Sequence, residues 1–196
     1  MSVFAEACQQ IESAYAHLGH DMGWRFLNSP SSLLARSTPI APITLNPGGS
    51  INRADHARES SEHGSAYVLE SWGRGHPPGE APLQLQIRRL FSMLSSALGR
   101  EPGGDGLLHA SLSAHFVPFR SPSIASLHRR EESFEFASDL WRGIFDHLDP
   151  RLLITIDRRT TDALERIFTV TREVFSAFSN HVSPLDEWVC VRWWTT

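Results

Sequence analysis

The chain has 196 residues, hydrophobic residues make up 41% of it, and its formal net charge is −4. This length and apolar content are typical of one folded domain, so we expect a single domain over residues 1–196 and exclude a disordered chain. No apolar run approaches the ~20 residues that span a bilayer, and the N-terminus lacks the basic and apolar regions of a signal peptide. We therefore expect no membrane partner, and two cysteines far apart in the sequence, expected to be reduced, point to a cytoplasmic location.

Cysteine and histidine usage argues against a metal centre. Cys8 and Cys190 are far apart and share no metal-ligand spacing, so we expect them to be reduced core residues. An iron–sulfur cluster needs about four ligands, usually cysteines, and is excluded. His56, His63 and His76 have no recognised ligand spacing either, which favours solvated loop histidines. The sequence predicts neither a metal nor a cofactor.

All 18 basic residues are arginines, because the chain contains no lysine. Several occur in pairs, at 88–89, 129–130 and 158–159. The arginine fork binds phosphate well, but for each pair alone a solvated helix surface is the simpler interpretation. The negative net charge does not by itself indicate a nucleic-acid-binding protein.

The predicted elements alternate between helix and strand along the chain. Residues 3–18 have apolar side chains at helical spacing, and Gly19 is a natural end of that helix. Residues 43–45 predict a short buried strand that runs straight into a turn at 46–49. Residues 50–79 have no clear periodicity, and so long a loop is usually functional or disordered.

The second half continues the alternation. Residues 103–106 predict a glycine-rich turn, and the continuously apolar residues 152–156 are typical of a strand covered on both faces. The other predicted elements are helices over 82–98, 131–148, 161–167 and 174–178 and strands over 110–116 and 188–193.

Strands separated by helices predict a parallel sheet covered on both sides. We therefore expect an α/β fold, with three α/β/α layers around a central, mainly parallel four-stranded sheet. Ligands bind such sheets beyond the carboxyl ends of the strands. Those ends are residues 46–49, 115–118, 157–158 and 195–196, and the first two have the most unusual sequences in the chain.

Four segments, in order, resemble the uracil-DNA glycosylase superfamily. Residues 45–49 (Leu-Asn-Pro-Gly-Gly) resemble the Gly-hydrophobic-Asn-Pro-Gly motif of its mismatch-specific and single-strand-selective branches. Residues 115–121 resemble a second-strand segment that commonly begins with asparagine and continues to Pro-Phe. Residues 153–164 resemble the third strand and its helix, where a glycine normally follows the strand, and 188–194 fall where the fourth strand belongs. Asn-Pro-Gly alone is a common turn, and the ordered set is more specific.

This resemblance implies a DNA glycosylase, which hydrolyses an N-glycosidic bond and leaves an abasic site. The absence of lysine, the usual Schiff-base nucleophile, predicts that the enzyme is monofunctional. It implies that Asn46 is catalytic and holds a water against C1′ of the sugar, where positive charge develops. Pro47 would stiffen the turn, while Gly48 and Gly49 would let the backbone approach DNA closely. The alternative is a purely structural turn.

The sequence departs from the family's pattern at two places. His115 replaces the asparagine that reads uracil in many relatives, and imidazole cannot offer the paired donor and acceptor of an amide. We therefore expect a damaged or modified base, in particular a modified pyrimidine, with a core histidine as the alternative. By analogy alone, the role is DNA repair or defence against phages with modified DNA. The family's second motif, His-Pro-Ser, is missing, which leaves open a catalytically degenerate DNA- or protein-binding module or a hydrolase of another substrate.

Aromatic and polar residues near these motifs complete the expected site. Tyr67 and Phe116 are candidates to stack on an extruded base, and each is equally suited to the core. Arg120 and Ser121 belong to the second-strand segment and are expected DNA contacts. Residues 193–194 (Trp-Trp) are candidates for an inserted wedge, although packing is the simpler role. We expect a monomer whose partner is DNA.

Overall fold

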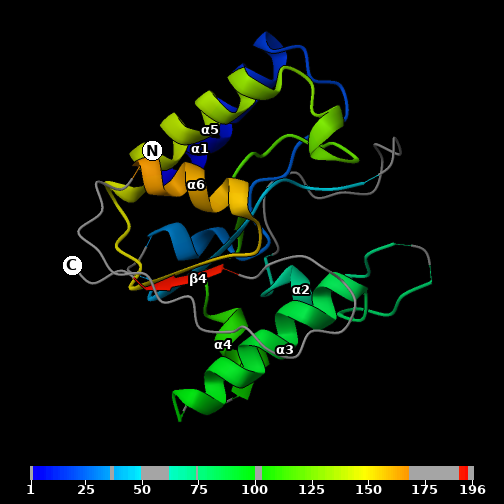
Figure 1. Cartoon of the computed structure of the whole chain (residues 1–196), viewed down its shortest axis with the longest axis vertical. Helices are drawn as coiled ribbons and strands as arrows, with labels where there is room; N and C mark the ends of the chain where they lie inside the picture. The colour runs from blue at the N-terminus through cyan, green and yellow to red at the C-terminus, as the bar shows by residue number, and fades with distance from the viewer. Residues whose placement is uncertain are drawn as a thin grey trace.

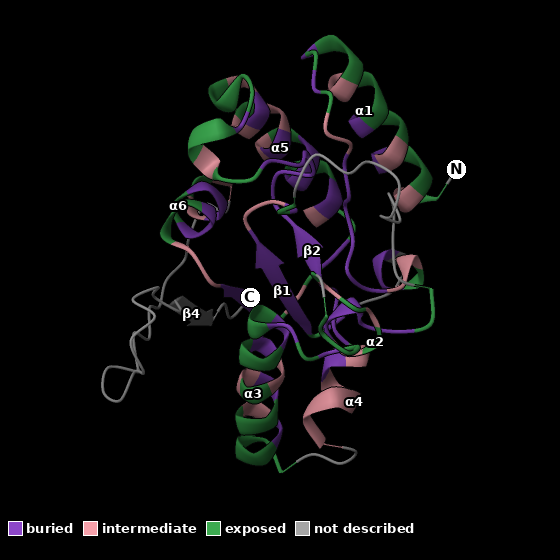
Figure 2. Cartoon of the chain, turned by 90° about the vertical axis from the view of Figure 1, so that its right-hand side faces the viewer, coloured by how far each residue is buried: buried purple, intermediate pink, exposed green. Residues whose placement is uncertain are grey.

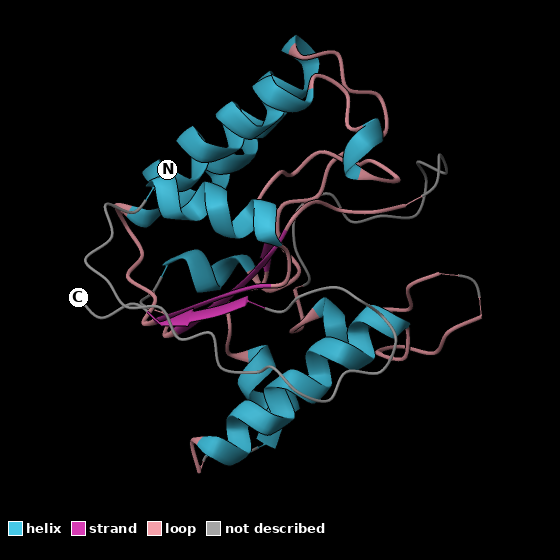
Figure 3. Ribbon diagram, in the orientation of Figure 1, coloured by secondary structure: helices cyan, strands magenta, loops and turns pink. Residues whose placement is uncertain are grey.

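The computed structural model describes residues 2–35, 38–49, 62–73, 75–99, 103–167 and 190–193. Its helices are α1 (Val3–His17), α2 (Ala66–Leu69), α3 (Pro82–Ala97), α4 (Gly103–His109), α5 (Arg130–Phe145) and α6 (Arg158–Ile167), with 3-10 turns η1 (Ser31–Ala35) and η2 (Ile124–Ser126). Its strands are β1 (Ile40–Thr44), β2 (Ala114–His115), β3 (Leu152–Thr155) and β4 (Cys190–Trp193). The predicted mixed α/β class is confirmed (Figure 3).

The strands are ordered β2-β1-β3-β4 in the sheet. β1 pairs parallel with both β2 and β3, so the carboxyl ends of these three strands meet at one edge. β4 pairs antiparallel with β3, and Cys190 lies opposite Thr155. The expectation that the last strand also ends at this edge is therefore wrong. Because β4 begins beside the end of β3, its own end lies at the opposite edge.

Helices cover both faces of the sheet (Figure 1). α1, α5 and α6 lie on one face, and α2, α3 and α4 lie on the other. Successive strand residues point to opposite faces, so Ala41, Ile43 and Leu153 enter the core beneath α1 and α5, whereas Ile40 and Ile154 enter the core beneath α3. Both faces are buried (Figure 2), which explains why the strands are apolar without alternation.

A buried amide holds α2 against α3. α3 begins at Pro82, which suits a first helical position because proline lacks an N–H. Two residues later, Gln84 is fully buried, and its Nε2 donates to the carbonyls of Ala66 at 2.9 Å and Glu70 at 2.7 Å. Its Oε1 accepts from the Ala81 N–H at 3.0 Å. This amide therefore fixes both ends of α2.

An irregular segment, residues 24–28, runs antiparallel to the outer side of β2. Leu27 bridges to Ala114, and the Asn28 N–H donates to the Ser113 carbonyl at 2.8 Å. The Arg25 N–H donates to the Pro118 carbonyl at 2.9 Å. These backbone contacts bring a part of the chain with no periodic pattern to the edge where β1, β2 and β3 end.

Two predicted segments differ in the structure. Residues 103–109 form α4 instead of a turn, because Gly104 packs against α3 so closely that a Cβ would lie 2.5 Å from the Ser92 nitrogen. β2 is confined to Ala114–His115, shorter than the predicted 110–116. The predicted helix at 174–178 and the wedge candidate Trp194 lie outside the described residues, as does the side chain of Trp193.

Within the part of the chain that the structure describes, no helix is long and apolar enough to cross a membrane. In those same residues, no three histidine, cysteine, aspartate or glutamate side chains converge as a metal site would require. Cys8 is partly buried and packs against the core beneath α1 and α5.

Candidate functional site

A cavity of about 810 Å³ opens at the edge where the three parallel strands end. Its walls come from the turn after β1, from β2 and the segment that follows it, from the end of β3, and from residues 25–28 and 67–73. The expected site residues that line it are Asn46, Pro47, Gly48, Gly49, Tyr67, His115 and Arg120. The parallel topology thus brings together residues from distant parts of the sequence.

Two expected site residues do not line the cavity. Phe116 is fully buried in the opposite core, where its ring lies 5.8 Å from that of Phe134. The reason is strand alternation: His115 points to the cavity, so the next side chain points to the other face. Ser121 lies behind Asn46, where its Oγ accepts a hydrogen bond from the amide and donates to the Ser123 carbonyl. Ser121 is thus placed to orient Asn46 and not to touch a ligand.

The side chain of Asn46 is held by its amide nitrogen. Nδ2 donates to the Pro47 carbonyl at 3.2 Å, the Phe119 carbonyl at 3.3 Å and Ser121 Oγ at 3.3 Å. No described residue contacts Oδ1 with a hydrogen bond, so this acceptor is the atom that Asn46 can present to a water or a ligand. Gly49, which ends the turn, has a φ of 133°, a conformation that favours glycine.

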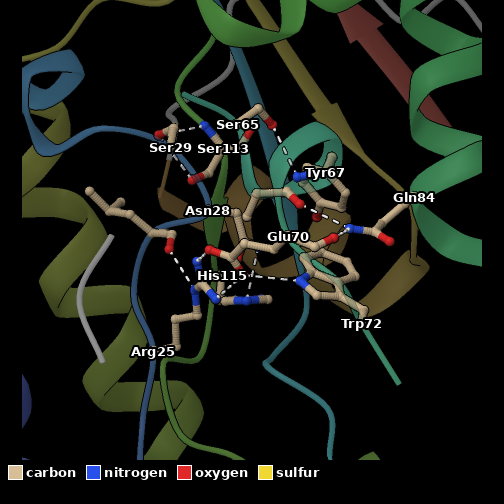
Figure 4. A network of polar contacts seen from close by, with 12 residues as sticks. Arg25, Asn28, Ser29, Ser65, Tyr67, Glu70, Trp72, Gln84, Ser113 and His115 are labelled. Atoms are coloured by element: carbon tan, nitrogen blue, oxygen red, sulfur yellow. Dashed lines mark hydrogen bonds and ion pairs between the residues drawn. The ribbon is translucent and has the colours of Figure 1, made fainter. Parts of the chain in front are cut away.

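Both ring nitrogens of His115 are engaged inside the protein (Figure 4). Nε2 lies 3.0 Å from Asn28 Nδ2, and Nδ1 lies 2.9 Å from Thr44 Oγ1. Thr44 Oγ1 also lies 3.4 Å from the Ala114 carbonyl, which can only accept, so the hydroxyl donates there and accepts from Nδ1. His115 therefore carries its proton on Nδ1 and accepts from Asn28 through Nε2.

The charge state of His115 agrees with this arrangement. Burial, with a further contribution from the Arg25 and Arg120 guanidinium groups, holds the pKa of His115 well below its usual value. The imidazole is neutral at physiological pH, and neither nitrogen is available to read a base. His115 positions Asn28 in the cavity wall.

A second buried histidine has a lowered pKa on the opposite side of the sheet. His20 stacks on Phe119 with ring centroids 4.1 Å apart, and its Nε2 lies 3.0 Å from Ser133 Oγ. Burial and the nearby His128 lower the pKa of His20 to about 4, while Asp21 acts in the opposite direction.

We expect the free energy of unfolding to fall as the pH drops below about 6.5, the ordinary histidine pKa. His20 and His115 both have a lower pKa in the folded protein, so the unfolded chain binds more protons in this range. Their stabilising contribution is complete above pH 6.5 and is lost progressively toward pH 4. Urea denaturation from pH 4 to pH 8 measures this loss, and His20→Gln should make the profile less steep. A His20→Gln profile parallel to that of the wild type contradicts the assignment.

A buried ion pair forms another part of the wall. The Arg25 side chain is 5% exposed, and its guanidinium donates to both oxygens of Glu70, at 2.7 and 2.6 Å. Its Nε donates to the Leu27 carbonyl at 2.9 Å, and Trp72 Nε1 donates to the same carboxylate at 3.1 Å. Trp72 in turn meets the ring of Tyr67 edge to face, with centroids 5.0 Å apart. The two aromatic rings are therefore fixed in one orientation.

Arginines make the cavity positive although the chain as a whole is acidic. Arg25, Arg120, Arg158 and Arg159 line it. Glu70 neutralises Arg25, and Asp157 is the carboxylate among the described lining residues, so the arginines remain in excess. Arg120 is 7% exposed and donates to the Gly48 carbonyl at 2.8 Å, which ties the turn after β1 to the segment after β2. Burial, with a further contribution from Arg25, lowers the pKa of Arg120. Such a wall favours an anionic ligand.

Asp157 immediately precedes α6 at the cavity wall. Its Oδ1 accepts from the Thr160 N–H at 2.8 Å, a helix cap that explains why α6 starts here. Its Oδ2 is buried and has no hydrogen-bond partner among the described residues. Together with Asn46, it gives the cavity a second oxygen acceptor at a strand end.

Sequence reasoning missed Arg25, Asn28 and Trp72 as cavity residues. Arg25 and Asn28 lie in an unpatterned segment, and only backbone pairing with residues 113–118 places them here. Trp72 follows α2 within the unpatterned stretch, where a lone tryptophan two residues after a glutamate is a weak signal. The sequence marks Asp157 only as the end of a strand.

Comparison with known proteins adds no family assignment to this geometry. No family model matches the chain, and no curated protein or solved structure matches it either.

Proposed function

We propose that this protein is a DNA glycosylase that removes a damaged or modified base, in particular a modified pyrimidine, and leaves an abasic site. One observation carries the proposal: the Asn46 turn, the second-strand segment at His115 and the third-strand end at Asp157 line a single cavity. These are the segments whose order along the chain resembles the uracil-DNA glycosylase superfamily. The proposed fold is that family's three-layer domain with a four-stranded sheet.

Asn46 supports a hydrolytic mechanism. Its Oδ1 would accept a hydrogen bond from water and hold the water oxygen toward C1′, while Ser121 and two backbone carbonyls fix the amide. Cleavage of the glycosidic bond leaves positive charge on the sugar and negative charge on the base. The fixed guanidinium of Arg120 would stabilise that negative charge without reorganisation.

The cavity walls support binding of a flipped nucleotide. Trp72, which is partly exposed and backed by the buried Tyr67 ring, offers aromatic surface on one side, and stacking contributes about 1–3 kcal/mol per base. Arg158 and Arg159 lie at the start of α6, where a helix N-terminus also favours phosphate. The volume of about 810 Å³ leaves room for a substituent on a pyrimidine ring. Repair and defence against phage DNA are both compatible with this chemistry, and we propose that the protein acts as a monomer on DNA.

The direct test is incubation with a panel of oligonucleotides that carry different modified pyrimidines, followed by alkaline cleavage at abasic sites. We expect strand cleavage after alkali with at least one modified base and none with unmodified DNA. Asn46→Ala protein, purified in parallel, is the control for contaminating glycosylases. Binding of the panel without any cleavage would instead indicate a degenerate DNA-binding module, and absence of both would reject the proposal.

We expect a monofunctional enzyme that leaves the strand intact until alkali is added. Bifunctional glycosylases attack C1′ with an amine and pass through a Schiff base, for which lysine is the usual nucleophile. This chain has no lysine, and arginine stays protonated. Borohydride added during turnover should therefore trap no covalent complex. A trapped adduct would show that the α-amino group is the nucleophile and that water held by Asn46 is not.

A further inference from the structure

We infer that Asn28 is the residue that determines ligand specificity in the cavity, and that it selects a base presenting an N–H group to its Oδ1. The inference rests on the proposed function for the ligand's class, a nucleobase. It adds a recognition residue from a segment with no motif of its own.

The side-chain oxygen of Asn28 is buried without a partner. Asn28 is 1% exposed and lines the cavity, and its Oδ1 has no hydrogen bond to any residue that the structure describes. Burial raises the pKa of Tyr67, and a hydrogen bond with the Asn28 side chain acts in the opposite direction, as expected when the amide nitrogen is the donor. This contact therefore leaves Oδ1 unpaired. Native proteins keep few such groups, and each calls for an explanation.

The orientation of the amide follows from its neighbours. The Ala114 carbonyl accepts from Thr44, Thr44 accepts from Nδ1 of His115, and Nε2 of His115 therefore accepts from Nδ2 of Asn28. The low pKa of the buried imidazole keeps the ring neutral at neutral pH, so Nε2 has no proton while Nδ1 carries the only one. The nitrogen is thus directed to His115, and the oxygen is left as an acceptor.

The nearest arginines do not supply the missing donor. The guanidinium of Arg25 is committed to Glu70 and to the Leu27 carbonyl, and Arg120 donates to Gly48. The contrast with Gln84 is informative, because both the oxygen and the nitrogen of that buried amide are paired inside the protein. The amide of Gln84 is structural, whereas that of Asn28 is arranged to meet a ligand.

Two kinds of base edge offer the required donor. A uracil-type base presents the ring imide N3–H, and a cytosine-type base presents its exocyclic N4–H. Either N–H can donate a hydrogen bond to Oδ1. Replacing the N–H hydrogens by methyl groups removes this donor from both kinds of base. A site with a buried polar group rejects an analogue that leaves this group unpaired.

The experiment measures binding of nucleosides by ligand-observed NMR and does not depend on excision. One pair is thymidine and 3-methylthymidine, and the other is 2′-deoxycytidine and its N4,N4-dimethyl derivative. We expect the wild type to bind the N–H member of one pair at least about 10-fold more tightly. The pair that shows the preference identifies an imide or an amine donor. N4-methyl-2′-deoxycytidine, which keeps one N–H, controls for the bulk of a methyl group.

Variants then assign the preference to Asn28. Asn28→Leu should abolish the preference, whereas Asn28→Asp keeps an acceptor and should retain it. Gln84→Leu, a matched change of a buried amide, should lower the melting temperature without altering the preference. Lack of preference or of binding in the wild type, or a preference that survives Asn28→Leu, overturns the inference. Preference without excision of any base would instead reject the proposed glycosylase function and leave the role of Asn28 standing.

Discussion

Substitution of Asn46 by alanine is expected to reduce the rate of base excision by about 10²- to 10³-fold, the loss typical of removing one preorganised polar group from an active site. Its Oδ1 is the acceptor proposed to hold the attacking water, and three hydrogen bonds from Nδ2 keep it in place. Because the substrate contacts of the cavity remain, the effect should appear in kcat and not in KM.

The fold should tolerate this substitution. Asn46 is only partly buried in a turn, so we expect its loss to cost about 1–2 kcal/mol of unfolding free energy. Single-turnover excision and urea denaturation of the same preparation separate the two effects. Ser121→Ala removes one of the three bonds and should reduce excision by less than about 10-fold. Near-wild-type excision by folded Asn46→Ala protein would remove Asn46 from the mechanism.

Substitution of Glu70 by leucine is expected to destabilise the fold by about 3 kcal/mol, because it leaves a buried guanidinium unpaired. The Arg25 side chain is 5% exposed, and its two hydrogen bonds to the carboxylate measure 2.6 and 2.7 Å. Trp72 loses its acceptor as well. Urea denaturation at neutral pH measures the change.

A double-mutant cycle tests the physical cause. The Glu70 side chain is 28% exposed and can be hydrated when its partner is removed, so Arg25→Leu should cost less than Glu70→Leu. The double variant Arg25→Leu with Glu70→Leu should recover much of the loss, because no uncompensated charge remains. Strictly additive effects would show that the pair is not coupled.

The local sequence pattern is sufficient to predict the long helices and the apolar strands. The periodicity of 3.6 residues predicts α1, α3 and α5 close to their observed bounds, because each buries one apolar stripe. The run at 152–156 predicts β3, and the turn at 46–49 marks the end of β1. From these elements follow the α/β class and the edge of the sheet at which the cavity opens.

Strand direction and helix α4 depended on tertiary contacts. The direction of β4 is decided by hydrogen bonds to β3, about which the sequence of an edge strand says nothing. α4 contains three glycines that predict a turn, yet it forms because Gly104 allows close packing against α3. In both cases the partner element supplies the free energy that local propensity does not.

The sequence by itself determined that Asn46 lies at the carboxyl end of a strand and that no lysine is present for Schiff-base chemistry. Only the tertiary structure decided what surrounds Asn46. Asn28 and His115 are 87 residues apart, and their contact depends on the backbone pairing of residues 24–28 with the outer side of β2. Such pairing is made by main-chain groups common to all residues, so the residue types in the sequence do not indicate it. For this reason the residues that complete the cavity wall could be identified only from the folded structure.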